Sequence, residues 1–211
     1  MKTDVTIIGL GLIGASLGLA FKNANLNGTI IGVDNDQQVV EKAIAIGAID
    51  RGDSLKSAVV AADIIIICTP LAAFPEILAK IKPVIKSGSI VTDVGSTKAE
   101  VMRLFEQLPS GVWAIGGHPM AGAELKGIRG ADSYLFENAI YVLTPGQDTP
   151  EHIVKRLSQL LTMTGARIQI LDAALHDQLV ATVSHVPHLA AVALVNSTEG
   201  NPDTLRLAAG G

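Results

Sequence analysis

Short apolar runs recur along this chain, and each is followed by a stretch with helical periodicity. The runs are rich in Ile and Val and are apolar throughout, which is typical of strands covered on both faces of a sheet. We expect strands at 5–9, 29–33, 63–68, 89–94, 112–116, 139–143 and 166–170. Strands separated by helices favour right-handed βαβ crossovers. The sequence therefore predicts an α/β fold with a doubly wound, mostly parallel sheet.

The pattern changes after residue 170, where no further strand follows. Residues 172–198 are expected to form one long apolar helix, with a kink at Pro187. A lone helix that is apolar around most of its circumference needs a partner to cover it. We therefore expect one domain at 1–170 and, at 171–211, the opening of an all-helical domain that this chain does not complete.

Composition argues against several kinds of partner. The formal net charge is −4 and there is no run of Lys or Arg, so nucleic acid and anionic membranes are not expected as partners. We expect no uncharged apolar run near the roughly 18 residues that cross a bilayer, and the start MKTDVTIIG does not resemble a signal peptide. The single cysteine, Cys68, rules out an internal disulfide and fits a reducing compartment. These features predict a cytoplasmic protein.

The motif GLGLIG at 9–14 follows the first expected strand and opens the first expected helix. In this G-x-G-x-x-G pattern Gly9 makes a tight turn, Gly11 lets a pyrophosphate approach the backbone, and Gly14 lets helix and strand pack closely. The anion then lies at the helix N-terminus, where unpaired N–H groups point toward it. The motif predicts a Rossmann-type dinucleotide-binding domain at 1–170.

Asp34 ends the second expected strand, 20 residues beyond Gly14. An acid at that distance accepts hydrogen bonds from the adenosine ribose hydroxyls and repels a 2′-phosphate, which favours NAD over NADP. The alternative is that Asp34 or Asp36 simply caps the next helix.

Two more strands end in polar residues. Thr69 and Pro70 follow DIIIIC, and Ser96, Thr97 and Lys98 follow SIVTDV. Ligands in doubly wound sheets lie beyond the carboxyl ends of the strands, so these residues are placed at the cofactor crevice. For Thr97 we expect only a cap on the following helix. The residues predicted to bind cofactor are Gly9, Gly11, Leu12, Ile13, Gly14, Asp34, Thr69 and Pro70.

His118 lies in GGHPMAG, where Gly and Pro predict a tight loop just past a strand. It joins Gly11, Thr69 and Ser96 at the same edge of the sheet. A histidine beside a nicotinamide can accept the proton of a substrate hydroxyl as hydride leaves the same carbon. The alternative is a loop histidine bonded to backbone.

His185 and His188, in SHVPH, are spaced i, i+3 and share a helix face. The spacing would suit a metal pair, but no carboxylate or cysteine set completes a site, so we expect no metal. Buried core histidines are the other alternative.

Several motifs together resemble one family. In chain order they are GLGLIGASL, CTP, TDVGSTK, GGHPMAGAELKGIRGAD, LFENAIYVLTP and VSHVPH. They closely resemble the prephenate and arogenate dehydrogenases across nearly the whole chain. The resemblance implies NAD(P)-dependent oxidative decarboxylation in tyrosine biosynthesis, in which hydride leaves C4 of the cyclohexadiene and CO₂ leaves C1.

The resemblance also implies roles for individual residues. The catalytic histidine is His118 and the serine that orients it is Ser96. The acid after the HPMAG loop is Glu124, and His185 and His188 lie on the substrate side. A carboxylate-binding arginine and a helical dimerisation domain are expected beyond AAGG, so the family would form homodimers through that domain and this chain would be truncated.

Two alternative functions remain open from the sequence. One is another two-domain nicotinamide enzyme, a hydroxyacid dehydrogenase or an imine reductase, because such enzymes share the N-terminal fold. The other is a dinucleotide-binding fragment without catalysis. The sequence does not choose between prephenate and arogenate.

Overall fold

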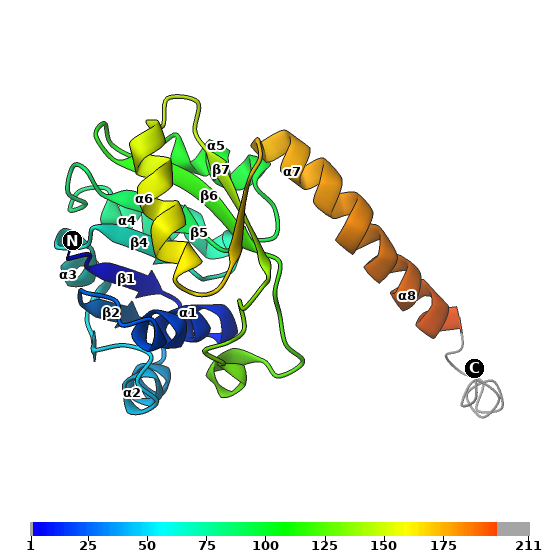
Figure 1. The fold of residues 1–211 in the computed structure, drawn as a ribbon, viewed down its shortest axis with the longest axis horizontal. Helices are drawn as coiled ribbons and strands as arrows, with labels where there is room; N and C mark the ends of the chain where they lie inside the picture. The colour runs from blue at the N-terminus through cyan, green and yellow to red at the C-terminus, as the bar shows by residue number, and fades with distance from the viewer. Residues whose placement is uncertain (1, 198–211) are drawn as a thin grey trace.

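The structure is a computed structural model that describes residues 2–197, and it contains one eight-stranded sheet in the order β3-β2-β1-β4-β5-β6-β7-β8 (Figure 1). The strands are β1 (Val5–Ile8), β2 (Ile30–Val33), β3 (Arg51–Gly52), β4 (Ile64–Ile67), β5 (Ile90–Asp93), β6 (Trp113–Pro119), β7 (Ile140–Pro145) and β8 (Arg167–Ile170). All seven expected strands are present, and β3 is an additional short one. The predicted doubly wound, mostly parallel sheet is confirmed.

Helices cover both faces of this sheet. The helices that cover it are α1 (Leu12–Asn23), α2 (Gln37–Ala45), α3 (Leu55–Val60), α4 (Phe74–Ile81), α5 (Ala99–Phe105) and α6 (Glu151–Thr162), while α7 (Ala173–Val180) and α8 (Val186–Ser197) follow the last strand. Shorter 3₁₀ turns lie at η1 (Leu71–Ala73) and η2 (Gly127–Gly130), and a π-helical turn, η3, spans Ala181–His185.

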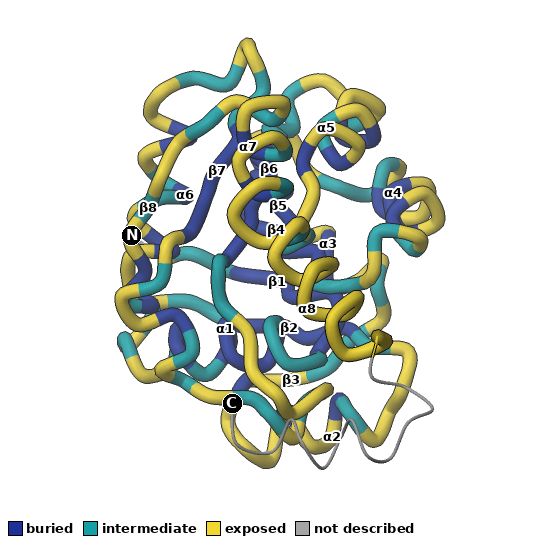
Figure 2. Tube along the Cα trace, turned by 90° about the vertical axis from the view of Figure 1, so that its right-hand side faces the viewer, coloured by how far each residue is buried: buried dark blue, intermediate teal, exposed yellow. Residues whose placement is uncertain are grey.

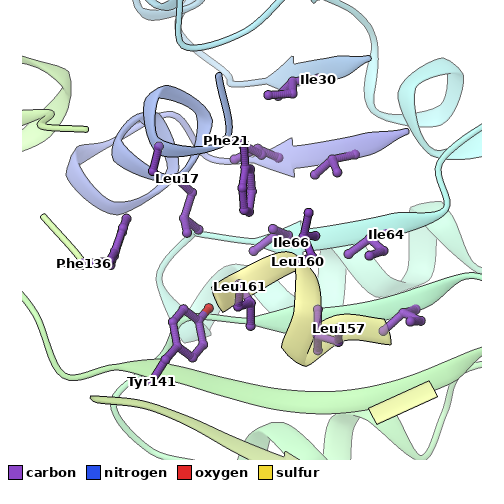
Figure 3. Packing of buried hydrophobic residues seen from close by; sticks show 14 of the residues in the cluster. Leu17, Phe21, Ile30, Ile64, Ile66, Phe136, Tyr141, Leu157, Leu160 and Leu161 are labelled. Carbon is purple, nitrogen blue, oxygen red and sulfur yellow. The ribbon is translucent and has the colours of Figure 1, made fainter. Parts of the chain in front are cut away.

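Alternate residues of the central strands pack into two separate cores. Ile64 and Ile66 of β4 pack in one core with residues of α1, such as Phe21, and with residues of α2 and α6 (Figure 3). Ile65 and Ile67 pack on the opposite face with α3, α4 and α5. Because each face of β4 is buried, its sequence is apolar at every position instead of at every second one.

The strands do not all run in one direction. β6 and β7 are antiparallel, and β7 and β8 are parallel to each other. The chain between β6 and β7 contains only the turn η2, so no helical crossover returns it to the starting edge. This link packs against α1, where the backbone N–H of Asp132 donates to Ser16 Oγ at 3.0 Å. The sequence pattern indicated these strands but not the reversal.

The C-terminal helix leaves the body of the molecule (Figure 1). α7, η3 and α8 form one continuous helical segment, Ala173–Ser197, and most of α8 is exposed (Figure 2). The kink expected at Pro187 stays a prediction; a π-helical turn, η3, lies just before that residue. The predicted helix end at Thr198 lies outside the described residues.

This segment has 25 residues, and an 18-residue window within it has a mean hydropathy of 1.5, so by length and composition it could cross a membrane. The expectation that no apolar run approaches that length was wrong, because Pro187 and the two histidines do not interrupt the helix. A single such helix is weak support for a membrane span.

Candidate active site

The glycine loop between β1 and α1 is shaped by contacts that only glycine permits. Gly9 has φ +93°, and a Cβ there would lie 2.8 Å from the carbonyl oxygen of Cys68. A Cβ on Gly14 would lie 2.0 Å from the carbonyl oxygen of Gly9. A Cβ on Gly11 would meet nothing within 4 Å. Gly9 and Gly14 therefore fix the loop against β4 and α1, whereas Gly11 leaves open space above it.

No side chain in the described part of the chain caps the start of α1 by a hydrogen bond. Gly11 is the N-cap residue and supplies no side-chain hydrogen bond, and Leu12 and Ile13 in the first turn are half-buried. The first backbone N–H groups of α1 are left for another acceptor, as an anion site requires.

Asp34 is held at the end of β2 by two backbone groups. Its Oδ2 accepts from the N–H of Leu10 at 2.8 Å, and its Oδ1 accepts from the N–H of Asp36 at 3.0 Å. Asp36, not Asp34, caps α2, through a 2.9 Å bond from the N–H of Gln38. Asp34 thus joins the glycine loop to β2 at the rim of a cleft.

That cleft has a volume of about 460 Å³ and lies at the carboxyl ends of β1, β2 and β4. Thr69 lines it with its Oγ1 buried and without a hydrogen-bond partner in the described part of the chain. The residues predicted to bind cofactor that line this cleft are Gly9, Asp34, Thr69 and Pro70.

His118 lies inside β6 and not on a loop, so the loop prediction was wrong. β6 continues to Pro119 because β7 pairs with it, and His118 lies opposite Val142. The preceding glycines serve close packing: a Cβ on Gly116 would lie 2.3 Å from Thr144 Oγ1, and one on Gly117 would lie 2.4 Å from the carbonyl oxygen of Asp93. His118 is only 8% exposed.

A buried ion pair fixes the backbone just before His118. Lys98 Nζ and Asp93 Oδ2 are in direct contact, and both side chains are fully buried. Lys98 Nζ also donates to the Gly117 carbonyl at 2.7 Å, while the Gly117 N–H donates to Asp93 Oδ1 at 2.9 Å. Burial raises the pKa of Asp93 and lowers the pKa of Lys98, and their mutual attraction opposes both shifts. Gly117 is thus held at both its N–H and its C=O.

His118 contacts a second histidine that the sequence did not single out. His118 Nδ1 lies 2.9 Å from His176 Nε2, and His176 Nδ1 lies 2.8 Å from Asp177 Oδ1. His176 is completely buried on α7. The only local signal was the pair His-Asp at the start of an otherwise apolar helix.

Burial lowers the pKa of His118 to about 4, and His176, Lys98 and His185 add to that shift while Asp177 opposes it. His118 is therefore neutral at neutral pH and has one unprotonated ring nitrogen.

Asp177 also occupies the start of α5. Its Oδ1 accepts from the N–H of Lys98 at 2.7 Å, and its Oδ2 accepts from the N–H of Ala99 at 2.9 Å. The expected cap by Thr97 was therefore wrong, because a carboxylate from α7 takes the amides instead.

The other predicted site residues are dispersed. Ser96 and Glu124 are exposed, and no hydrogen bond or ion pair joins either to the described residues. His185 is half-buried at the end of η3, and His188 is exposed on α8, so neither is a core histidine. Among residues 2–197 no three His, Cys, Asp or Glu side chains gather as a metal site would require.

Comparison with known proteins adds to this geometry. Residues 17–170 match the family model for the prephenate dehydrogenase nucleotide-binding domain, and residues 172–211 match that for the prephenate dehydrogenase dimerization domain. Prephenate dehydrogenase of Bacillus subtilis is 40% identical over all of this chain, which spans 59% of that protein's length.

Solved structures agree. Synechocystis arogenate dehydrogenase matches with a TM-score of 0.83 and 38% identity, over 99% of this chain and 73% of that one. Prephenate dehydrogenase of Aquifex aeolicus, solved with hydroxyphenyl propionate and NAD⁺, matches with a TM-score of 0.85 and 28% identity, over 99% of this chain and 79% of that one. This chain belongs to the prephenate dehydrogenase family.

Proposed function

We propose that this chain carries the NAD-binding domain and the catalytic histidine of an enzyme that oxidatively decarboxylates prephenate or arogenate. The observation that carries the proposal is the position of His118. It is a buried, neutral histidine near the carboxyl end of β6, at the same sheet edge as the glycine loop that follows β1. Family membership and the NAD⁺ in the Aquifex relative support it.

The cleft and the start of α1 beside it fit a dinucleotide. Gly11, Leu12 and Ile13 would hold the pyrophosphate at the open start of α1. Asp34 would accept the ribose hydroxyls, and Thr69 and Pro70 would lie beside the bound cofactor. When bound, the nicotinamide supplies the hydride acceptor. The carboxylate of Asp34 favours NAD, because a 2′-phosphate would meet a like charge there.

His118 acts as the base. The substrate carries a hydroxyl and a hydrogen on C4, and the hydrogen leaves as hydride. His118 accepts the hydroxyl proton as the C4–O bond gains double-bond character. The C1 carboxylate then leaves as CO₂, its bonding electrons enter the ring, which becomes aromatic, and the C4 oxygen takes the proton back from His118. No further catalyst is needed for the second stage, because aromatisation drives it.

The residues on the substrate side follow from the resemblance. Ser96 would orient His118, and Glu124, His185 and His188 would face the substrate. Of these, His185 lies near enough to His118 to contribute to its lowered pKa.

An assay of NADH formation tests the proposal. The protein is mixed with NAD and either prephenate or arogenate, and absorbance of NADH is followed, with the His118→Ala variant as control. NADH that forms only when substrate is present, and with the wild-type protein but not with His118→Ala, would support the proposal. NAD binding by calorimetry with no NADH from either substrate would identify a nucleotide-binding module instead.

We also propose a homodimer formed through the helical domain, in the cytoplasm. The helix exposes large apolar side chains, among them Val183 at 66%, Leu189 at 66% and Leu194 at 70%. An apolar face of this kind is normally covered in a soluble protein, and the match to a dimerization domain supports a second copy as the cover. Light scattering should show self-association, and a monomer at all concentrations would contradict it.

A further inference from the structure

We propose that Asp177 and His176 are positioning residues that fix the tautomer of His118, so that Nε2 of His118 is the unprotonated nitrogen. This inference rests on the proposed function, in which His118 accepts a proton. It concerns two residues on α7, the helix that begins beyond the nucleotide-binding body.

The chain of contacts starts from a carboxylate that can only accept. Asp177 receives the N–H groups of Lys98 and Ala99 as well as the ring of His176. Partial burial of Asp177 works against ionisation, but the hydrogen bonds from Ala99, His176 and Lys98 outweigh it and lower the pKa of Asp177. Asp177 is therefore ionised at neutral pH, and its oxygens accept from all three partners.

The direction of each following bond is then determined. Because Asp177 accepts, Nδ1 of His176 must carry the proton. We take the completely buried His176 as the neutral imidazole, which carries one N–H, so its Nε2 is an acceptor. It lies 2.9 Å from Nδ1 of His118, which must donate to it. Nε2 of His118 is then left with a free lone pair.

The geometry suits a fixed orientation as well as a fixed tautomer. The two rings meet edge to face, with centroids 5.1 Å apart and an interplanar angle of 69°. His176 is completely buried, so solvent does not compete for its Nε2. Ser96, the residue expected to orient His118, is exposed and has no hydrogen bond to His118 in the described structure.

Asp177 has a second role as the cap of α5, and the experiment must separate the two. Asp177→Asn keeps the shape and an oxygen acceptor for the α5 amides but removes the charge that makes the carboxylate an obligate acceptor. Asp172→Asn is the matched control, because the side chain of Asp172 caps α7 through the N–H of Leu175 at 2.8 Å and has no hydrogen bond to a histidine ring in the described structure.

Histidine ¹⁵N NMR of the 211-residue chain reads the tautomer directly, without substrate. In the wild-type protein we expect His118 with Nδ1 protonated and Nε2 unprotonated. In Asp177→Asn the ratio of the two tautomers should move by roughly tenfold or more, as loss of a charge-assisted hydrogen bond predicts. Asp172→Asn should leave the ratio unchanged.

A wild-type His118 protonated on Nε2 would overturn the proposal, and that result does not depend on any variant folding. An unchanged ratio in a folded Asp177→Asn variant would overturn it too. In the active enzyme, Asp177→Asn should lower kcat roughly 10- to 100-fold with little change in KM for NAD. If the tautomer is as expected but no substrate yields NADH, the proposed function fails while the tautomer assignment stands.

Discussion

The two halves of the candidate site are built from different materials. The nucleotide end is built from backbone: Gly9, Gly11 and Gly14 shape a loop whose useful groups are main-chain amides. The His118 end is built from side chains drawn from three segments, β5 with the turn after it, β6 and α7. A backbone site depends on a local sequence pattern, whereas a side-chain site depends on which distant segments the fold brings together.

The largest effect should come from the side-chain end. His118→Ala in the intact enzyme should lower kcat by roughly 10²- to 10⁴-fold, the usual value of a positioned general base, while NAD affinity changes little. Steady-state kinetics together with calorimetry of NAD binding would measure both. A variant with near-normal kcat would remove His118 from the mechanism.

Removal of the buried Lys98–Asp93 ion pair, which supports the side-chain end, should give the next largest effect. Lys98→Met leaves Asp93 buried without its partner, so the free energy of unfolding should fall by about 3–5 kcal/mol. Arg103→Met is the control, because the Arg103–Glu100 pair is exposed and should matter little. Urea denaturation would compare them, and equal small losses would mean that the buried pair does not hold Gly117.

Substitutions in the glycine loop should separate effects on stability from effects on NAD binding. Gly14→Ala puts a Cβ against the carbonyl oxygen of Gly9 and should cost about 1–3 kcal/mol of stability. Gly11→Ala meets open space, so it should leave thermal unfolding nearly unchanged while weakening NAD binding. The comparison fails if Gly11→Ala binds NAD as tightly as the wild-type protein.

We expect the cofactor preference to depend on one side chain beside the glycine loop, Asp34. Asp34→Ser combined with Asn35→Arg should shift preference toward NADP by about tenfold, because a repulsive charge is replaced by a phosphate partner. Asn35→Arg alone is the control and should shift it less. Binding titrations with both cofactors decide the matter, and a wild-type protein that already prefers NADP would refute the role of Asp34.

Lowering the pH should produce the smallest difference between the backbone end and the side-chain end. The GLGLIG loop has no ionisable side chain, whereas His118 has a folded-state pKa of about 4, against about 6.5 in an unfolded chain. As pH falls, the unfolded chain takes up this proton at a higher pH than the folded protein does. The contribution of neutral His118 to the free energy of unfolding is therefore complete above about pH 6.5 and is lost as pH falls toward 4. NMR titration of the ring protons should show a midpoint near 4. A midpoint near 6.5 would mean that burial does not depress the pKa.

Sequence reasoning succeeded where structure is local. The strands and the three glycines of the loop follow from short patterns whose meaning does not depend on the rest of the chain. It failed at β7, because apolar periodicity carries no information about strand direction. It also placed His118 on a loop, because Gly116, Gly117 and Pro119 indicate a turn until an antiparallel neighbour extends the strand.

The partners of His118 were missed for a related reason. His118 and His176 are 58 residues apart, and their contact exists only because α7 begins beside the start of α5. His176 and Asp177 lie in a stretch whose pattern indicates an apolar helix and nothing more. Because α7 begins beside the start of α5, Asp177 caps α5 in place of Thr97.

The capping of α5 by Asp177 also affects where anions are attracted at this edge of the sheet. A free helix start carries roughly half a positive charge, and α1 keeps that charge because Gly11 has no side chain over it. At α5 the carboxylate of Asp177 already neutralises it. The two helix starts at this edge therefore differ in electrostatic character, and a phosphate is drawn to α1. The C1 carboxylate of the proposed substrate would find no compensating charge at the start of α5.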